Sequence, residues 1–201
     1  MMRSYVLAAA LWLSAGCALR AQDGFTAVTS YTFSVPFGDT RHFVTMPSWL
    51  GMNWEGAWML NGHTSAGLAF GVHDFNESSF GTTDFPSGSA TGQQMRDLLV
   101  TTLMGTGRWY LFADRTHRPY VGLGAGVVYS DQMYTLGFSQ TSQSAWHLAV
   151  APEAGWVFPM IEGIEALVTA RYTAPAANGQ YIGGGPRRFP FATISIGLIE
   201  R

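Results

Sequence analysis

The sequence predicts an all-β protein, an eight-stranded antiparallel up-and-down transmembrane β-barrel that follows a secretory signal peptide. Charged residues make up only 12% of the 201 residues, about half the share of an ordinary soluble domain. Apolar residues reach 47% and aromatic residues 14%, yet no apolar run is long enough to cross a bilayer as a helix. Segments of alternating apolar and small or polar residues fill the rest. A secreted β-sandwich is the alternative, but it would expose too many apolar side chains to water.

The first 21 residues have the pattern of a signal peptide. Arg3 supplies the positive charge, and an apolar stretch from Tyr5 to Ala15 precedes small residues. Cleavage after Ala21 would remove the single cysteine, Cys17, and leave residues 22–201 as the barrel domain. A lipidation site at Cys17 is a second interpretation of the segment Ser14 to Cys17.

The eight expected strands are separated by alternately short and long connections. Asn61 and Gly62 form a strong hairpin signal, whereas residues 36–48, 75–93, 132–143 and 174–188 form long connections rich in Gly, Ser, Thr, Pro and Gln. Short turns at one rim and long loops at the other are typical of outer-membrane barrels. The strands are expected at about 25–35, 49–60, 63–74, 94–112, 119–131, 144–158, 163–173 and 189–199.

Along each strand, bulky apolar residues occupy one face and small, hydroxyl or charged residues the other. In the fifth strand, Val121 and Leu123 alternate with Gly122 and Gly124. We expect the bulky face to contact lipid and the other face to line the interior. The fourth strand fits least well, because Arg96 and Arg108 share a face with Leu98, Val100 and Met104. That face is placed inward, since an arginine facing lipid near the bilayer centre costs about 2–4 kcal/mol. Trp and Tyr concentrate near strand ends, which suits two interfacial girdles.

Four segments carry a resemblance to a known family. They are YTFSVPFGDT, GMNWEGAWMLNGHTSAGLAFGVHDF, RPYVGLGAGVVYSD and FPFATISIGLI. Over about residues 23–199 the chain resembles the small eight-stranded outer-membrane proteins of the OmpX-like and OmpW-like type. Their last residue is usually aromatic, whereas this sequence ends in Ile199, Glu200 and Arg201.

The resemblance implies a bacterial outer-membrane location more than it implies an activity. The partners expected from it are outer-membrane lipids, with periplasmic chaperones and the barrel-assembly machinery during biogenesis. The barrel is expected to be a monomer. The sequence has no basic stripe of the kind that binds nucleic acid, so no nucleic-acid partner is expected.

The inward face is predicted to contain a network of paired charges. A barrel of eight strands is only wide enough for side chains to fill, and buried charges need partners. The sequence therefore favours a closed, salt-bridged interior over a narrow channel for small solutes, which is the alternative. Gly122, Gly124 and Gly126 either leave room for larger side chains or line a small cavity. The network residues are Glu55, Arg96, Arg108, Glu153, Glu165 and Arg171.

No catalytic, cofactor or metal site is predicted, and the protein is expected not to be an enzyme. The five histidines show no Ser–His–acid pattern and no ligand spacing. A lipid-modifying enzyme is the remaining alternative, in which His73 and His147 would be the residues to test. Arg187 and Arg188, at the end of the last long loop, could contact lipid phosphates or a glycan. A structural or surface-interaction role is therefore expected. The histidines are His42, His63, His73, His117 and His147.

Overall fold

A computed structural model describes residues 24–85, 88–112, 116–161, 164–176, 179–180, 182 and 186–200. The predicted signal peptide, residues 1–21 with Cys17, lies outside the described residues, as does Arg201. Among the described segments, no helix has both the length and the apolar character needed to span a membrane.

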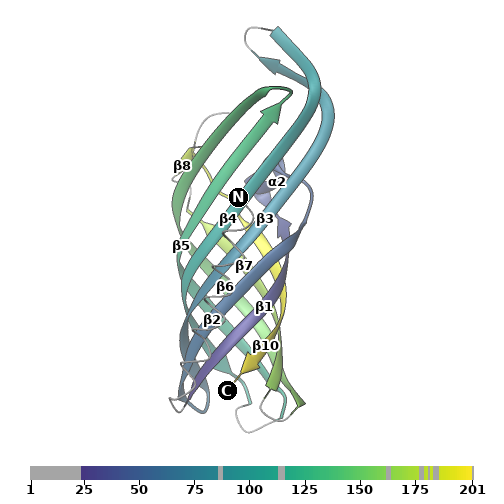
Figure 1. The fold of residues 1–201 in the computed structure, drawn as a ribbon. Helices are drawn as coiled ribbons and strands as arrows, with labels where there is room; N and C mark the ends of the chain where they lie inside the picture. Colours follow the sequence, from purple (N-terminus) through teal and green to yellow (C-terminus); the bar gives the residue numbers. More distant parts are fainter. Residues whose placement is uncertain are drawn as a thin grey trace.

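Eight long strands close into a single barrel, which confirms the predicted fold class (Figure 1). Successive strands pair antiparallel, and β1 closes the ring against β10 from Ala27–Glu200 to Pro36–Phe191. A short helix, α2 (Gly38–Phe43), connects the first two strands, and two short strands, β8 (Gly179–Gln180) and β9 (Pro186–Arg187), form a separate pair. The barrel strands are β1 (Phe25–Pro36), β2 (Ser48–Asn61), β3 (Thr64–Phe85), β4 (Gly88–Tyr110), β5 (Arg118–Leu136), β6 (Ser139–Ile161), β7 (Ile164–Pro175) and β10 (Phe191–Glu200).

The prediction of long loops at 75–93 and 132–143 is wrong, because both segments continue as β-hairpins. Strands β3 and β4 pair as far as Phe85–Gly88, and β5 and β6 pair as far as Leu136–Ser139. Gly137 has a φ of 58° and permits the two-residue turn between β5 and β6. Over residues 76–82, 91–93 and 133–143 the side chains on both faces are at least partly exposed, so these segments lack the apolar alternation that identifies strands in sequence.

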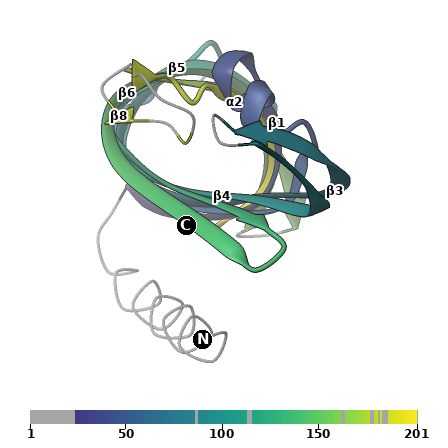
Figure 2. The same ribbon diagram turned by 90° about the horizontal axis from the view of Figure 1, so that it is seen from above.

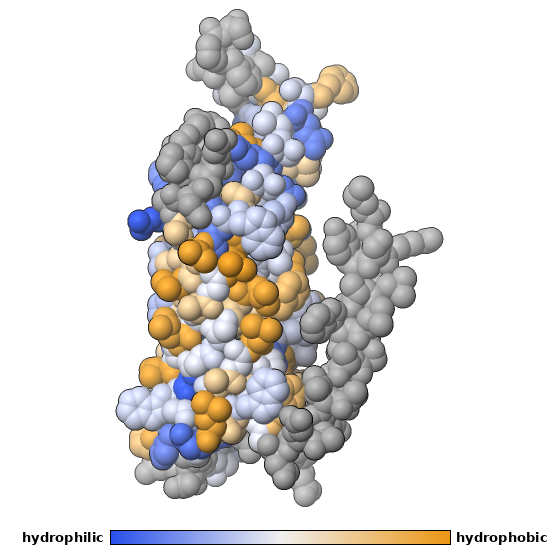
Figure 3. Space-filling view, turned by 90° about the vertical axis from the view of Figure 1, so that its left-hand side faces the viewer, coloured by the Kyte–Doolittle hydropathy of each residue, from blue (hydrophilic) through white to orange (hydrophobic). Residues whose placement is uncertain are grey.

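The apolar face of the barrel points outward, as its sequence pattern predicts. Leu123 is 56% exposed, Leu148 67% and Ile196 63%, while the residues that alternate with them are covered. On the face shown in the space-filling view, hydrophobic residues gather over the middle of the barrel and polar residues are frequent above it (Figure 3). This distribution is the reverse of a soluble barrel and matches a wall in contact with lipid.

The interior is divided into layers along the barrel axis. Near the short turns lies an apolar layer that includes Val28, Tyr110 and Leu167. Ion pairs follow, then hydroxyl side chains such as Thr32 and Ser195. A second apolar layer, called here the upper layer, lies toward the long hairpins. Its buried residues are Phe43, Val44, Phe75, Leu98, Val100, Met104, Val128, Ala149, Ala151, Phe189 and Phe191.

Candidate functional site

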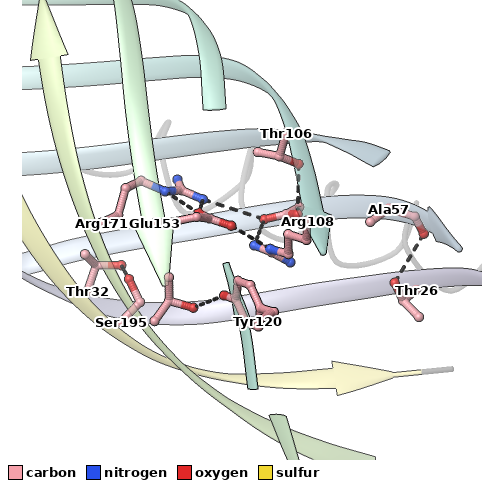
Figure 4. Close-up of polar contacts among 11 residues, drawn as sticks. Thr26, Thr32, Ala57, Thr106, Arg108, Tyr120, Glu153, Arg171 and Ser195 are labelled. Atoms are coloured by element: carbon pink, nitrogen blue, oxygen red, sulfur yellow. Dashed lines mark hydrogen bonds and ion pairs between the residues drawn. The ribbon is translucent and has the colours of Figure 1, made fainter. Parts of the chain in front are cut away.

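Four charged side chains from four strands form one network inside the barrel (Figure 4). Arg108 on β4 donates from Nη2 to Glu55 on β2 and from Nε to Glu153 on β6, each at 2.6 Å. Arg171 on β7 contacts the other oxygen of Glu153 through Nε at 2.7 Å. Thr106 adds a hydrogen bond to Glu55 at 3.0 Å. Two guanidinium groups and two carboxylates balance in charge, so the interior carries charge without a net excess of either sign.

Glycines on the same face provide the space that these large side chains occupy. A Cβ at Gly122 would lie 3.0 Å from both Cγ and Oε1 of Glu153, its neighbour in the ladder. A Cβ at Gly155 would lie 2.5 Å from the ring of Tyr120. The inward glycine of the fifth strand therefore makes room for a large side chain of the next strand, one of the two uses expected of it.

A second ion pair and two tyrosines continue the network toward the short turns. Arg118 contacts Glu165 at 2.5 Å and lies over the ring of Tyr110. Tyr110 packs on Tyr120, whose ring lies 4.9 Å from the guanidinium carbon of Arg108. Glu165 thus belongs to a separate pair. Sequence reasoning missed Arg118 because it was assigned to a turn, although it continues the alternation of Tyr120 and Gly122 by one step.

Arg96 does not join the network, which corrects the predicted grouping. It lies twelve residues from Arg108 along β4, about 40 Å at the rise of a strand. Its guanidinium instead approaches the carbonyl of Phe43 at 3.4 Å, where α2 ends, and the ring of Tyr134 at 5.8 Å. Alternation shows that two residues lie on the same side of a sheet, but it does not show that they lie at the same depth along the barrel axis.

The upper layer covers the mouth of the barrel. Phe43 and Val44 enter from the end of α2, and Phe189 enters from the segment before β10. The two segments are joined by hydrogen bonds from Phe37 N and Thr40 Oγ1 to the carbonyl of Pro190. In the view from above, α2 lies at the rim of the ring (Figure 2).

A carboxylate above the mouth ties the chain after α2 to β3. Glu77 accepts hydrogen bonds from both the backbone N–H and the hydroxyl of Thr45. Partial burial alone would raise the pKa of Glu77, but these two hydrogen bonds, one from Met46 and the nearby Arg96 together hold it below its ordinary value. The ionised Glu77 therefore stabilises the contact of this segment with β3.

Two histidines of the interior serve the packing around the mouth. His147 contacts Ser130 Oγ and the carbonyl of Ala176, each at 3.1 Å, and its ring meets the edge of Phe189. His73 contacts Ser34 Oγ at 2.9 Å and the ring of Phe191. Among the residues that the structure describes, no group of three His, Cys, Asp or Glu could hold a metal ion.

Above the barrel, β3, β4, β5 and β6 continue as a four-stranded sheet. The pairing of β2 with β3 ends at Leu50–Asp74, and the pairing of β6 with β7 ends at Ala149–Pro175. Within the described residues, no strand therefore pairs with the outer edge of β3 over 78–85 or of β6 over 139–142. These two segments are called here the free edges. The β3–β4 hairpin extends furthest from the barrel (Figure 1).

Of the two arginines predicted as a lipid or glycan contact, Arg187 and Arg188, the structure places Arg188 beside α2. Arg188 is exposed, and its backbone N–H donates to Asp39 at 3.2 Å. The side chain of Arg187 lies outside the described residues. Arg41 and His42, in the last turn of α2, are also exposed and were not singled out from the sequence.

Comparison with known proteins supports the fold. No protein-family model and no curated protein matches the sequence. Among solved structures, the Neisserial surface protein A is similar, with a TM-score of 0.58 and 11% identity over 89% of this chain and 97% of that chain. The attachment invasion locus protein Ail of Yersinia pestis, solved in complex with the heparin analogue sucrose octasulfate, gives a TM-score of 0.54 and 12% identity over 89% and 99%.

A major outer-membrane protein of Thermus thermophilus is similar as well. Its TM-score is 0.51 and its identity 9%, over 87% of this chain and 98% of that chain. At such identities the likeness establishes a shared fold, that of small outer-membrane β-barrels.

Proposed function

Starting from the barrel fold shared with these outer-membrane proteins, we propose that the chain is a non-enzymatic integral protein of the bacterial outer membrane with a surface-interaction role. The outward apolar wall supports insertion into outer-membrane lipid. The layered interior supports a closed lumen, because apolar side chains cover the ion pairs on both sides. The four-stranded sheet above the barrel is then the part that meets the surroundings.

The observation that carries the surface role is the pair of free edges. Exposed strand edges present unpaired N–H and C=O groups and are normally protected by charge, proline or a bulge. The free edge of β6, SQTS (residues 139–142), contains no Asp, Glu, Lys, Arg or Pro. The free edge of β3, SSFGTTDF, contains one acidic residue. Both suit the addition of an extended peptide strand, in which backbone hydrogen bonds supply the affinity.

The proposal is tested with the barrel in lipid nanodiscs and a library of displayed peptides. Selected peptides should raise the amide-exchange protection of residues 78–85 or 139–142. Ser142→Pro removes a backbone N–H that points away from β5 and should weaken binding at the β6 edge, whereas Phe138→Ala at the hairpin tip should not. Peptides that bind without changing exchange at either edge would contradict the surface role.

The closed lumen is tested separately in planar bilayers. The wild-type barrel should show no steady conductance, because Arg108, Glu55 and Glu153 fill the cross-section. Steady openings would instead support a narrow channel.

A second partner, an anionic glycan or lipid phosphate, is favoured by the exposed Arg41, His42 and Arg188 around α2. Such groups bind phosphate or sulfate through charge-assisted hydrogen bonds. Binding of the barrel to lipopolysaccharide or heparin should weaken in Arg41→Gln and Arg188→Gln and remain unchanged in Arg201→Gln. Equal binding by all variants would exclude this partner.

A further inference from the structure

A small polar chamber lies between the ion-pair network and the upper layer. Its volume is about 10 Å³, which is close to the minimum that holds one water molecule. Arg171 borders it on the network side, and Met104 and His73 border it toward the mouth. Most of the remaining lining is polar, with side chains from β1, β2, β4, β7 and β10.

Several polar groups that line the chamber have no hydrogen-bond partner among the described residues. They are the side chains of Asn53, Thr102, Thr173 and Thr193, all of which are buried. His73 uses Nδ1 to contact Ser34, and its Nε2 faces Gly71 and Thr102 without a partner in the described chain. Buried polar groups in native proteins are almost always paired with protein or with an ordered water.

Gly71 on β3 provides the space in which these groups converge. It pairs with Asn53 on one side and Thr102 on the other. A Cβ at this position would lie 2.7 Å from Thr102 Oγ1, 3.2 Å from His73 Nε2 and 3.3 Å from Asn53 Oδ1. The three polar atoms therefore surround the position that any larger residue would fill.

We propose that the chamber is a binding site for one ordered water molecule, held by Asn53, His73 and Thr102. Water fits because it donates and accepts at once, as an amide, an imidazole nitrogen and hydroxyls together require. The network below balances two arginines with two glutamates and offers no net charge to an ion. The upper layer separates this water from the mouth, so it exchanges slowly.

The chamber also explains how a closed barrel satisfies its hydroxyl layer. The bound water joins the side chains of Asn53 on β2, His73 on β3 and Thr102 on β4, which form no hydrogen bonds to one another. A water held by two to four polar groups is part of the fold and is costly to remove. The interior is then hydrated at one point without a continuous column of water.

The test is a pair of water-to-methyl NOE and ROE spectra on the full barrel in detergent micelles, with labelled threonine methyl groups. In the wild type, Thr102 and Thr193 should show water cross peaks with opposite NOE and ROE signs, which report a long-lived water. Gly71→Ala should abolish them. Gly107→Ala is the matched control, because a Cβ there meets nothing within 4 Å, and it should retain them.

Thr102→Val keeps the shape of the side chain and removes one of the water's partners, so it decides the question if Gly71→Ala does not fold. The cross peaks at Thr173 and Thr193 should weaken in this variant. The absence of long-lived water peaks in the wild type would overturn the proposal. Full-strength peaks in Gly71→Ala, or in Thr102→Val, would overturn it equally.

Discussion

Glu153→Gln is the substitution that perturbs the interior most specifically. The Glu153 carboxylate accepts hydrogen bonds from Arg108 Nε at 2.6 Å and from Arg171 Nε at 2.7 Å. Its side chain is fully buried. Glutamine has nearly the same shape, but it carries no charge and places an amide N–H beside a guanidinium. Two buried arginines would then share the single charge of Glu55.

The structure sets the magnitude of this loss. The distance from Arg171 to Glu55 is 3.8 Å, too long for a good hydrogen bond. Glu55 therefore cannot replace Glu153 as the partner of Arg171. Removing one member of a buried ion pair typically costs about 3–5 kcal/mol, and we expect the free energy of unfolding to fall by about that amount.

Urea unfolding of the barrel in lipid vesicles, followed by tryptophan fluorescence, measures this change. Glu165→Gln is the control, because the pair of Glu165 with Arg118 lies nearer solvent, at 19% and 10% side-chain exposure. Its loss should cost less than the loss of Glu153, because this pair keeps more contact with water. Equal effects of the two substitutions would refute the reasoning that the network is buried and its charges interdependent.

Three further substitutions or conditions test other parts of the structure. Leu123→Arg places a charge on the outer wall and should reduce the free energy of unfolding by about 2–4 kcal/mol in lipid; an unchanged value would mean that this face meets water. Phe189→Ala removes a fully buried ring from the mouth and should reduce the free energy of unfolding by about 3–5 kcal/mol; a much smaller loss would show that the upper layer is loosely packed. The lowered pKa of Glu77 means that its stabilisation is present above the ordinary carboxyl pKa and is lost as the pH falls through the lowered value. The protection factor of the Thr45 amide, which is the exchange rate of an unstructured peptide at the same pH divided by the observed rate, should therefore decrease on acidification, and a pH-independent protection factor would contradict the role given to Glu77.

The fold could be predicted from the sequence because the alternation of apolar and small or polar residues and the cost of a charge in lipid agree along most of the chain. Alternation fixes which side chains face lipid, as Val121 and Leu123 show against Gly122 and Gly124. For the fourth strand, the cost of an arginine facing lipid decided which face points inward, and Leu98, Met104 and Arg108 are indeed buried. A one-residue register error would place every charge of a strand in lipid.

The interior and the extensions were less predictable, for a physical reason in each case. Depth along the axis depends on strand stagger, which a single sequence does not reveal, so Arg96 was grouped with residues about 40 Å away. The extension of the β3–β4 hairpin, residues 75–85 and 88–93, has polar residues on both faces. Its Thr and Ser content is typical of a loop. Gly71 had no apparent role until its ladder neighbours Asn53 and Thr102 were known.

Spin-label accessibility along β5 tests the central claim, an apolar wall facing lipid around a filled interior, most directly. Single cysteines introduced at residues 121, 123, 125, 127 and 138 of the barrel in vesicles carry the label. Labels at 121, 123, 125 and 127 should collide freely with oxygen dissolved in the bilayer and not with a water-soluble nickel complex, whereas a label at the exposed Phe138 position of the hairpin tip should reach the nickel complex. Equal access of the nickel complex to both sets would show that this face of β5 does not lie in lipid.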